Sequence, residues 1–589
     1  MRYALNLLFS VFVGLAVALP GQAALAAGAK HKHMMAHAKA AAAAPAADLP
    51  PANPNCAYGA PSEEQLRLYA RKPFAEVPPI RSVNGVLTAT LTVGYADNSI
   101  LGCPVHLRSY NGGLIGPTLR VKPGDTMRIR LVNSLPRTSD PCPMHNMENE
   151  PGGFNLTNLH THGLHVSPSG NSDNVFLQVC PGGPPQDYEI HIPMDQPPGT
   201  HWYHAHLHGS TALQVSSGME GAIIVEGGQD TIPQIAAAQE RVMVLQQIAY
   251  DDRGVIESYD PIFDFDDNGR VITVNGQVMP VIAMQPGQVE HWRLVDAGVA
   301  ESMPLYVSNG QPNSYVPLYE IATDGNAMGR KDVWTSQGVE LEPGYRTDIL
   351  FKAPPLPAGQ QSVTYFLTTK PIAGVKRLQF ADAPRATPKQ LAAAYNGVAP
   401  PQTVAIIVVG GTLDDMALPT DAQLAPFMPF QPITDSELTG RPQTLNFMSA
   451  YAVCPGPGRP CTVCDPDDPK VKTTCKFRYM VDMIPYTTAR KRTLTLNKAS
   501  QWSLTAGTKA SPQAHPFHIH VNPFEMERTG PDGMPETVWK DTVLVTVGDP
   551  QAPLTLKSRY VDFTGEFVLH CHILTHEDQG MMENVEIVR

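Results

Sequence analysis

Four short histidine-rich stretches constrain the fold of this chain more than any other feature. They read "HTHGLH" (160–165), "HWYHAHLH" (201–208), "HPFHIH" (515–520) and "HCHILTH" (570–576), and they hold 13 of the 20 histidines in 589 residues. Burying so many imidazoles is costly unless they share a role. The fold must therefore bring two distant parts of the chain together.

The composition favours turn-rich β structure. The chain contains 57 prolines and 47 glycines, too many helix breakers for long helices. Its length exceeds what one hydrophobic core organises, so we expect several domains. The formal net charge is −12 without a basic stripe, which argues against nucleic acid as a partner.

Internal repeats divide the chain. The segments 116–133 and 278–296 each show an alternating strand, a Pro-Gly turn and a second alternating strand, which predicts a β-hairpin in each. A second unit recurs as "GTHWYHAH" (199–206), "QSVTYFLT" (361–368) and "GEFVLHCH" (565–572), each time near the end of a domain-sized block. The repeats predict an all-β chain of three Greek-key β-sandwich domains.

The predicted domains span residues 75–228, 240–385 and 400–589, and an Ala/Pro-rich segment (383–402) is predicted to link the second domain to the third. The middle domain has no histidine at the positions equivalent to those of the other two. We therefore expect the metal chemistry in domains one and three, with domain two as a spacer.

The first 26 residues are predicted to be a signal peptide, because an apolar run ends in the small-residue pattern Ala24-Leu25-Ala26. An uncleaved membrane anchor is the alternative, but no later run of about 18 apolar residues follows. We expect an exported protein, periplasmic or secreted, without stable membrane insertion. Residues 27–74 are predicted to be a flexible Ala/Pro/His leader, whose His and Met side chains either bind copper or have no role.

The nine cysteines suit an oxidising compartment. Eight can form four disulfides and leave Cys571 free, although the sequence does not give their pairing. The group Cys454, Cys461, Cys464 and Cys475 has structural zinc as its alternative.

Strand geometry explains the H-x-H spacing. Side chains alternate between the faces of a strand, so both rings of an H-x-H pair point the same way. Eight imidazoles suit a cluster of copper ions better than one structural zinc, which closes with about four ligands. The four pairs are His160/His162, His204/His206, His518/His520 and His570/His572.

The thiol of Cys571 points away from its two histidine neighbours. On that face it can meet His515 and His576, with Met581 as a weak axial partner and Met582 one residue out of place. Two imidazoles, a thiolate and a distant thioether form a blue-copper electron-transfer site. One strand would then touch two metal sites.

The chain resembles the multicopper oxidases of the laccase and bacterial copper-efflux oxidase type. Their motifs H-x-H-G, H-x-H, H-P-x-H-x-H and H-C-H-x3-H-x4-M stand here as "HTHG", "HAH", "HPFHIH" and "HCHILTHEDQGM". The resemblance implies three cupredoxin domains and four copper ions. It implies that type 1 copper is bound by His515, Cys571, His576 and Met581 and that type 2 copper is bound by His160 and His518. One type 3 copper would be bound by His162, His204 and His572, and the other by His206, His520 and His570. His165, His201 and His208 have no ligand role in the family.

The resemblance further implies that single electrons from a small-molecule or metal-ion reductant reduce dioxygen to water. Glu577 matches the family's proton-supplying carboxylate, and Asp173 is a second candidate; the alternative for each is an ordinary loop carboxylate. We expect a monomer.

Three functions compete: oxidation of phenols or similar aromatics, oxidation of a metal ion such as Cu(I), and a non-enzymatic role in copper carriage or envelope assembly. The complete ligand set argues against the third. The 22 methionines are scattered, without a methionine-rich insert, which favours aromatics over Cu(I). The segments 140–158 and 454–475 are unusual insertions that we expect to shape the substrate entrance.

Overall fold

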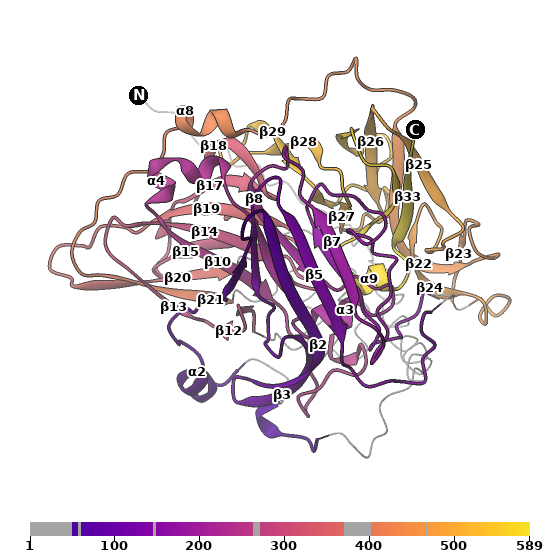
Figure 1. Cartoon of the computed structure of the whole chain (residues 1–589), viewed down its shortest axis with the longest axis horizontal. Coiled ribbons are helices and arrows are strands. Elements are labelled where there is room, and N and C mark those ends of the chain that lie inside the picture. The colour runs from indigo at the N-terminus through magenta and orange to yellow at the C-terminus, as the bar shows by residue number, and fades with distance from the viewer. Residues whose placement is uncertain (1–49, 57–60, 145–148, 263–270, 370–401, 467) are drawn as a thin grey trace, which may run out of the picture.

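The computed structural model describes residues 50–56, 61–144, 149–262, 271–369, 402–466 and 468–589. Their strands form six sheets, which pack in pairs into three β-sandwiches (Figure 1). The first sandwich lies at the front centre of the view, the second to the left and the third to the right. The predicted all-β class is confirmed, while the predicted signal peptide (1–26) lies outside the described residues.

The first sandwich encloses a core of buried apolar residues from both of its sheets. In β5, Met127, Ile129 and Leu131 face this core and Arg128 and Arg130 face solvent, because successive side chains alternate. One sheet has the order β3 (Cys103–Tyr110), β2 (Val86–Ile100), β5 (Thr126–Asn133) and β7 (Gln186–His191). The other has the order β1 (Pro79–Arg81), β4 (Thr118–Val121), β9 (Glu220–Val225), β8 (Gly199–His204) and β6 (His160–His162).

The second sandwich has its own core, in which Trp292 stacks on Phe351 with ring centroids 4.5 Å apart. Its larger sheet has the order β12 (Gln277–Val278), β11 (Thr273–Val274), β10 (Gln239–Gln246), β14 (Val289–Asp296), β19 (Arg346–Lys352), β17 (Leu318–Thr323) and β18 (Asn326–Trp334). Its smaller sheet has the order β13 (Val281–Met284), β21 (Thr403–Gly410), β20 (Ser362–Thr369), β15 (Leu305–Ser308) and β16 (Tyr315–Val316).

The third sandwich holds Cys571 and Met581 in its core. Its larger sheet has the order β23 (Thr462–Val463), β22 (Gln443–Val453), β26 (Lys498–Ala506), β31 (Leu554–Tyr560), β28 (Phe524–Thr529) and β29 (Pro535–Lys540), with β24 (Lys476–Val481) also paired to β22. Its smaller sheet has the order β25 (Lys491–Thr495), β33 (Met582–Val588), β32 (Gly565–Cys571), β27 (His515–Ile519) and β30 (Thr542–Val545).

Two sequence predictions about the strands are wrong. The Pro-Gly turns of 116–133 and 278–296 do not make hairpins, because β4 and β5, like β13 and β14, lie in opposite sheets of their sandwiches. The third predicted domain began at residue 400, yet β21 pairs with β13 and β20 of the second sandwich. Its apolar residues fill the core of that sandwich, which the linker-like composition before it did not indicate. Most of the predicted linker lies outside the described residues.

Part of the predicted flexible leader (27–74) is ordered. Residues 27–49 lie outside the described residues, but η1 (Pro54–Cys56) and α2 (Glu63–Tyr69) follow them. Ser62 and Gln65 form a capping box at the start of α2, and Cys56 is disulfide-bonded to Cys103. Phe74 then packs on the core of the second sandwich. The prediction of a flexible segment rested on its low apolar content. It missed the disulfide and the packing of Phe74, which hold the second part of the segment against the sandwiches.

The remaining helices are short and lie between strands: α3 (Thr211–Val215), η2 (Gly228–Thr231), α4 (Pro233–Ala236), α8 (Asp421–Leu424), η3 (Ala425–Phe427) and α9 (Leu574–Asp578). Within the described ranges, no helix is long and apolar enough to cross a membrane.

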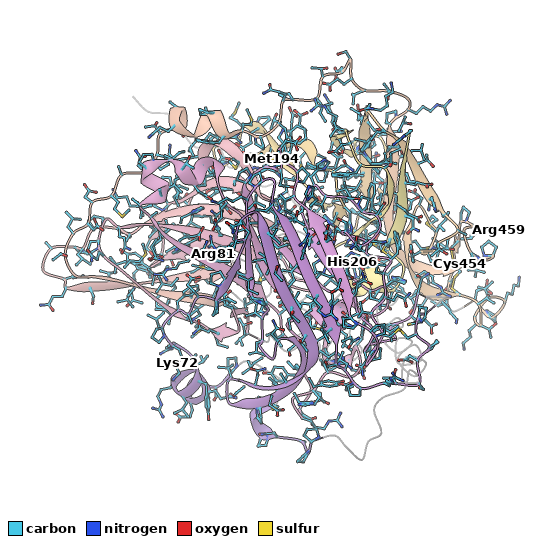
Figure 2. All side chains as sticks on the ribbon, in the orientation of Figure 1. Lys72, Arg81, Met194, His206, Cys454 and Arg459 are labelled. Atoms are coloured by element: carbon cyan, nitrogen blue, oxygen red, sulfur yellow. A yellow bond between two sulfur atoms is a disulfide. The ribbon has the colours of Figure 1, made fainter. Side chains whose placement is uncertain are left out.

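The cysteine prediction is confirmed. Eight cysteines form four disulfides, Cys56–Cys103, Cys142–Cys180, Cys454–Cys461 and Cys464–Cys475, and Cys571 is free and buried. The zinc alternative for the last four is therefore excluded. Figure 2 shows Cys454 and Arg459 at the outer edge of the third sandwich, whereas His206 lies well inside the molecule.

Candidate metal centre

Two pairs of antiparallel strands hold the predicted histidines in register. In the first sandwich His160 of β6 lies opposite His204 of β8, and in the third His518 of β27 lies opposite His570 of β32. The second histidine of three of the motifs, His206, His520 and His572, comes just after its strand ends.

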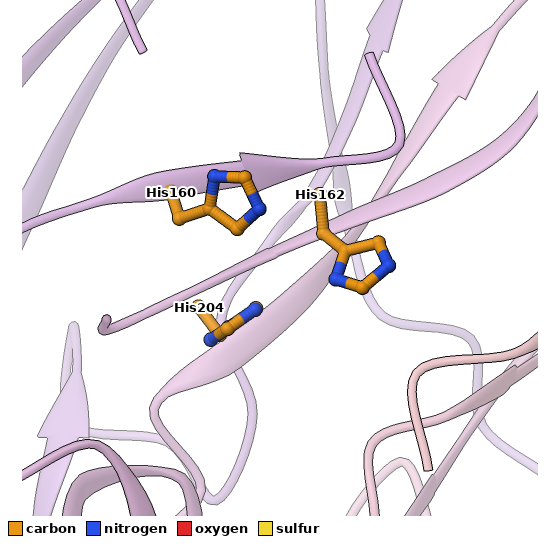
Figure 3. Close-up of side chains that lie close together, drawn as sticks. All are labelled: His160, His162 and His204. Atoms are coloured by element: carbon orange, nitrogen blue, oxygen red, sulfur yellow. The ribbon is translucent and has the colours of Figure 1, made fainter. Parts of the chain in front are cut away.

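The first and third sandwiches bring all eight rings together. The ring of His160 stacks on that of His520 and the ring of His162 on that of His518, each with centroids 3.8 Å apart. Figure 3 shows the side chains of His160, His162 and His204 close together. The ring nitrogens of three sets lie within 4.8 Å of one another: His160, His162 and His204; His160, His518 and His520; and His206, His520 and His570.

All eight histidines are buried. None exposes more than 3% of its surface. Burial lowers the pKa of His160, His162, His204, His206, His520, His570 and His572, which favours the neutral form that binds metal ions.

Several of these nitrogens have no hydrogen-bond partner: His160 Nε2, His162 Nδ1, His204 Nε2, His518 Nε2, His520 Nε2 and both nitrogens of His572. Two others, His206 Nε2 and His570 Nε2, face each other at 3.1 Å. Unpaired buried polar atoms cost free energy, and bound metal ions would satisfy them. The donor set therefore fits a cluster of imidazole-binding ions such as copper.

A second candidate site lies on the opposite face of β32. The Sγ atom of Cys571 is 3.6 Å from His515 Nδ1 and 3.7 Å from His576 Nδ1, and those two nitrogens are 3.2 Å apart. Burial raises the pKa of the Cys571 thiol, so a metal cation is needed to stabilise the thiolate there. Met581 belongs to the same core cluster as Cys571, whereas Met582 packs elsewhere with Val175, Tyr486 and Val568.

Comparison with known proteins agrees with this geometry. Two family models, each described as Multicopper oxidase, match residues 92–230 and 465–588, the segments that contain the four histidine-rich stretches.

The chain belongs to the multicopper oxidases.

A multicopper oxidase of Staphylococcus haemolyticus is 23% identical over 490 residues, covering 81% of this chain and 83% of its own. The laccase of Bacillus subtilis is 24% identical over 537 residues, covering 82% and 90%. A solved multicopper oxidase from Campylobacter jejuni, described as a metallo-oxidase, superposes with a TM-score of 0.62 at 20% identity, covering 91% of this chain and 98% of its own. The protein is thus a copper-dependent oxidoreductase, and its family uses a reductant together with dioxygen.

Helix α9 of this multicopper oxidase carries two of the predicted site residues in a row, His576 and Glu577. His576 faces the Cys571 site, while Glu577 turns toward the cluster, its two carboxylate oxygens 3.5 Å from His206 Nδ1 and His570 Nδ1. Thr211 Oγ1 donates a 3.2 Å hydrogen bond to Glu577, and burial raises the pKa of this carboxyl, assisted by Asp578.

Asp173, the second predicted carboxylate, lies beside a candidate ligand. Its oxygens are 3.0 and 3.1 Å from His160 Nδ1, and it accepts a 2.8 Å hydrogen bond from the backbone N–H of Thr161. Burial raises the pKa of Asp173 to about 7. The contact turns Nε2 of His160 toward the cluster and fixes the ring.

The three histidines without a family role are buried or half-buried beside the site. His165 contacts Val521 O at 2.8 Å and Asp562 Oδ1 at 2.9 Å, joining the first sandwich to the third. His208 Nε2 lies 3.1 Å from Asn149 Oδ1. The ring of His201 packs against Gly325, where a Cβ atom would clash with it.

Sequence reasoning missed Asp541, whose carboxylate is 3.2 Å from His162 Nε2. It also missed Asp578, which accepts backbone N–H groups from Gly209, Thr211 and Ala212 at the start of α3. None of the four motifs specifies an aspartate at either position. Only the packing of the sandwiches shows that these two aspartates lie beside the site.

Proposed function

We propose that the protein couples the one-electron oxidation of a reducing substrate, a phenol or similar aromatic by preference, to the four-electron reduction of dioxygen to water. The observation that carries the proposal is the two-faced strand β32. Cys571 lies in one candidate site, and its direct chain neighbours His570 and His572 lie in the other. Electrons accepted at the first site have a covalent path of a few bonds to the second.

The ligand assignment is part of the proposal. One type 1 copper takes His515, Cys571, His576 and Met581, and one type 2 copper takes His160 and His518. One type 3 copper takes His162, His204 and His572. The other type 3 copper takes His206, His520 and His570. Two of these ligand sets have their ligand atoms within 4.8 Å of one another: His206, His520 and His570, and His515, Cys571 and His576. The rings of His162, His204 and His572 have centroids 5.0 to 5.9 Å apart, which supports the assignment of the other type 3 copper.

When bound, copper supplies the one-electron redox chemistry and the binding of dioxygen. The chain's own groups orient and protect the site. Asp173 holds the ring of His160, and burial of all eight imidazoles excludes bulk water. Burial raises the pKa of Glu577 and so favours its protonated form, and the side chain is placed to deliver protons to the cluster.

The surroundings of His576 favour an aromatic substrate over a metal ion. The half-buried ring of Tyr479 stacks on His576 with centroids 4.3 Å apart. Phe477 lies 5.4 Å from Tyr479, and Tyr451 lies 5.3 Å from Phe477. A row of half-buried rings on β22 and β24 thus leads to the candidate type 1 site, and such rings bind flat aromatic molecules by stacking.

Oxidation of a metal ion such as Cu(I) is the second candidate, favoured by the description of the Campylobacter jejuni relative as a metallo-oxidase. Export to the periplasm or the exterior belongs to the proposal as well, supported by four disulfides, which persist in oxidising compartments. We also propose that the protein acts as a monomer.

Oxygen consumption by the copper-loaded protein, measured with phenols, Cu(I), Fe(II) and Mn(II), tests the proposal. We expect the protein to oxidise phenols while it reduces dioxygen to water. The value of kcat/KM should be highest for the aromatic substrates. Cys571→Ser should lose both the blue absorption and turnover, because an alcohol cannot replace the copper-thiolate bond. Oxygen consumption with metal ions alone would favour the second candidate, and an active, blue Cys571→Ser variant would refute the site assignment.

A further inference from the structure

The second sandwich reaches the metal cluster through Arg346 and the turn that precedes it. Arg346, the first residue of β19, is fully buried where all three sandwiches meet. Its Nε donates to Thr200 O of the first sandwich at 3.4 Å, and its two Nη atoms donate to Gly344 O and Asp324 O of the second at 2.9 Å each. The other two N–H groups bind both carboxylate oxygens of Asp541 in the third sandwich, with Nη1 to Oδ1 at 2.8 Å.

All five donors of the guanidinium are therefore used, and they hold Asp541 in a bidentate contact. This geometry is specific to arginine, whose planar fork matches a carboxylate. The backbone of Asp541 is held as well, because Asp324 Oδ2 accepts the N–H groups of Asp541 and Thr542 at 3.2 Å each. The side chain of Asp541 has little freedom to move.

Asp541 in turn contacts two histidines of the cluster in different ways. Its Oδ1 atom is 3.2 Å from His162 Nε2 and accepts a 2.8 Å hydrogen bond from Thr542 Oγ1. Its backbone oxygen is 2.9 Å from His518 Nδ1, which also lies 3.0 Å from Thr542 Oγ1. A carboxylate and a carbonyl oxygen only accept hydrogen bonds, so on each ring the nitrogen that faces Asp541 is the one that carries a proton.

The opposite nitrogen of each ring is then left for a metal. For His162 it is Nδ1 and for His518 it is Nε2, and both are buried without a hydrogen-bond partner. The two rings, stacked at 3.8 Å, thus offer different nitrogens to the cluster.

We propose that Arg346 is a positioning residue of the cluster: through Asp541 it fixes which ring nitrogens His162 and His518 offer to copper. The inference rests on the proposed copper cluster, and it gives the middle sandwich a role in the site beyond that of a spacer. The alternative is that Asp541 binds a metal together with His162 and His518, whose ligand atoms lie within 4.8 Å of its own. The contacts of the carboxylate argue against it, because Oδ1 already accepts from Arg346 and Thr542 and Oδ2 accepts from Arg346.

A second contact from the same loop supports the role. A Cβ atom on Gly344, whose φ is +89°, would lie 2.8 to 3.0 Å from the ring atoms of His572. The turn that leads into Arg346 therefore packs directly against another candidate ligand, and only glycine leaves room for the ring.

The test compares two arginines of the same sandwich. Arg346→Lys removes the bidentate contact, whereas Arg293→Lys makes the same change at an equally buried arginine that pairs with Asp230, Glu240 and Asp348 and contacts no cluster histidine. Copper content, the electron paramagnetic resonance spectrum of the type 2 copper and the blue absorption are measured, together with copper titration of the metal-free protein. None of these readouts needs turnover.

We expect Arg346→Lys to keep the blue absorption while its cluster binds copper roughly 10- to 100-fold more weakly, with an altered type 2 spectrum. Arg293→Lys should keep both the affinity and the spectrum. Thr542→Val, which removes only the hydroxyl that lies between Asp541, His162 and His518, is a milder second variant and should alter the type 2 spectrum with a smaller loss of copper affinity. Unchanged cluster spectra and affinity in Thr542→Val, or the same losses in both lysine variants, would overturn the inference.

The result is separable from that of the proposed function. A wild-type protein that binds four coppers but oxidises none of the reductants would sink the proposed oxidase activity and leave the positioning role to be judged on the spectra. A wild-type protein without a type 2 copper spectrum would overturn both.

Discussion

Replacing Glu577 by glutamine isolates the proposed proton donor from the rest of the site. The side chain is fully buried, accepts one hydrogen bond from Thr211 and lies 3.5 Å from ring nitrogens of His206 and His570. Glutamine has nearly the same volume and can still accept from Thr211, but it cannot deliver a proton at neutral pH. The substitution should therefore leave the ligands in place and remove only the acid.

The structure sets the expected magnitudes. Because the buried carboxyl has a raised pKa, no buried charge is lost, and the free energy of unfolding should change by about 1 kcal/mol or less. Loss of an acid catalyst lowers rates by roughly a hundredfold, which corresponds to about 2.7 kcal/mol in the activation barrier. Copper content and the blue absorption should stay at wild-type levels.

Two measurements separate electron entry from proton delivery. Stopped-flow reduction of the blue copper by a phenol without oxygen should run at the wild-type rate, while steady-state oxygen consumption falls. Glu577→Asp, which keeps an acid but shortens the side chain, should fall between the two proteins. Wild-type turnover by a fully copper-loaded Glu577→Gln variant would refute the proton role and leave Asp173 as the remaining candidate.

Three other perturbations test different parts of the site. His162→Ala should keep the blue absorption and anaerobic reduction by substrate but lose oxygen consumption, since it removes only a cluster ligand; loss of the blue colour would contradict the separation into two sites. Tyr479→Leu should raise the KM for phenols about fivefold, the equivalent of about 1 kcal/mol of stacking, without altering the blue absorption, and an unchanged KM would exclude stacking. The Asp562 contact raises the pKa of His165 against the effect of burial, so its stabilisation is full below the unfolded pKa near 6.5 and is lost as pH rises through the higher folded value. Urea unfolding should therefore show His165→Gln less stable than wild type by about 1 kcal/mol near pH 5, after discounting for the partly exposed Asp562, and by less near pH 9.

The histidine motifs could be predicted because their spacing encodes strand geometry. An H-x-H pair needs only the alternation of a β-strand to place both rings on one face, and Cys571 between two histidines needs only the same alternation to face away. The structure places the eight imidazoles side by side and places His515 and His576 beside Cys571. The structure also distinguishes the two methionines. Met581, which the motif spacing favours as the axial ligand, belongs to the same core cluster as Cys571, whereas Met582 packs in another cluster.

The contacts between sandwiches could not be predicted in this way. Arg346 and Asp541 are 195 residues apart, and no local pattern relates a strand start in the second sandwich to a turn in the third. The turns of 116–133 and 278–296 looked like hairpins because local alternation is the same whether two strands pair or lie in opposite sheets. For the same reason β21 was assigned to the wrong sandwich: only its partners β13 and β20 reveal where it belongs.

The division of the cluster between the two ends of the chain has a consequence for how the protein matures. His206 and His570 face each other across 364 residues of sequence. Because closing a long loop costs chain entropy, we expect contacts of such separation to form late in folding. A growing or truncated chain that lacks β32 and α9 keeps six of the eight cluster imidazoles but has neither Cys571 nor an enclosed site, so it does not hold the full set of copper ligands. Copper that survives exhaustive dialysis therefore counts the molecules that have folded to completion.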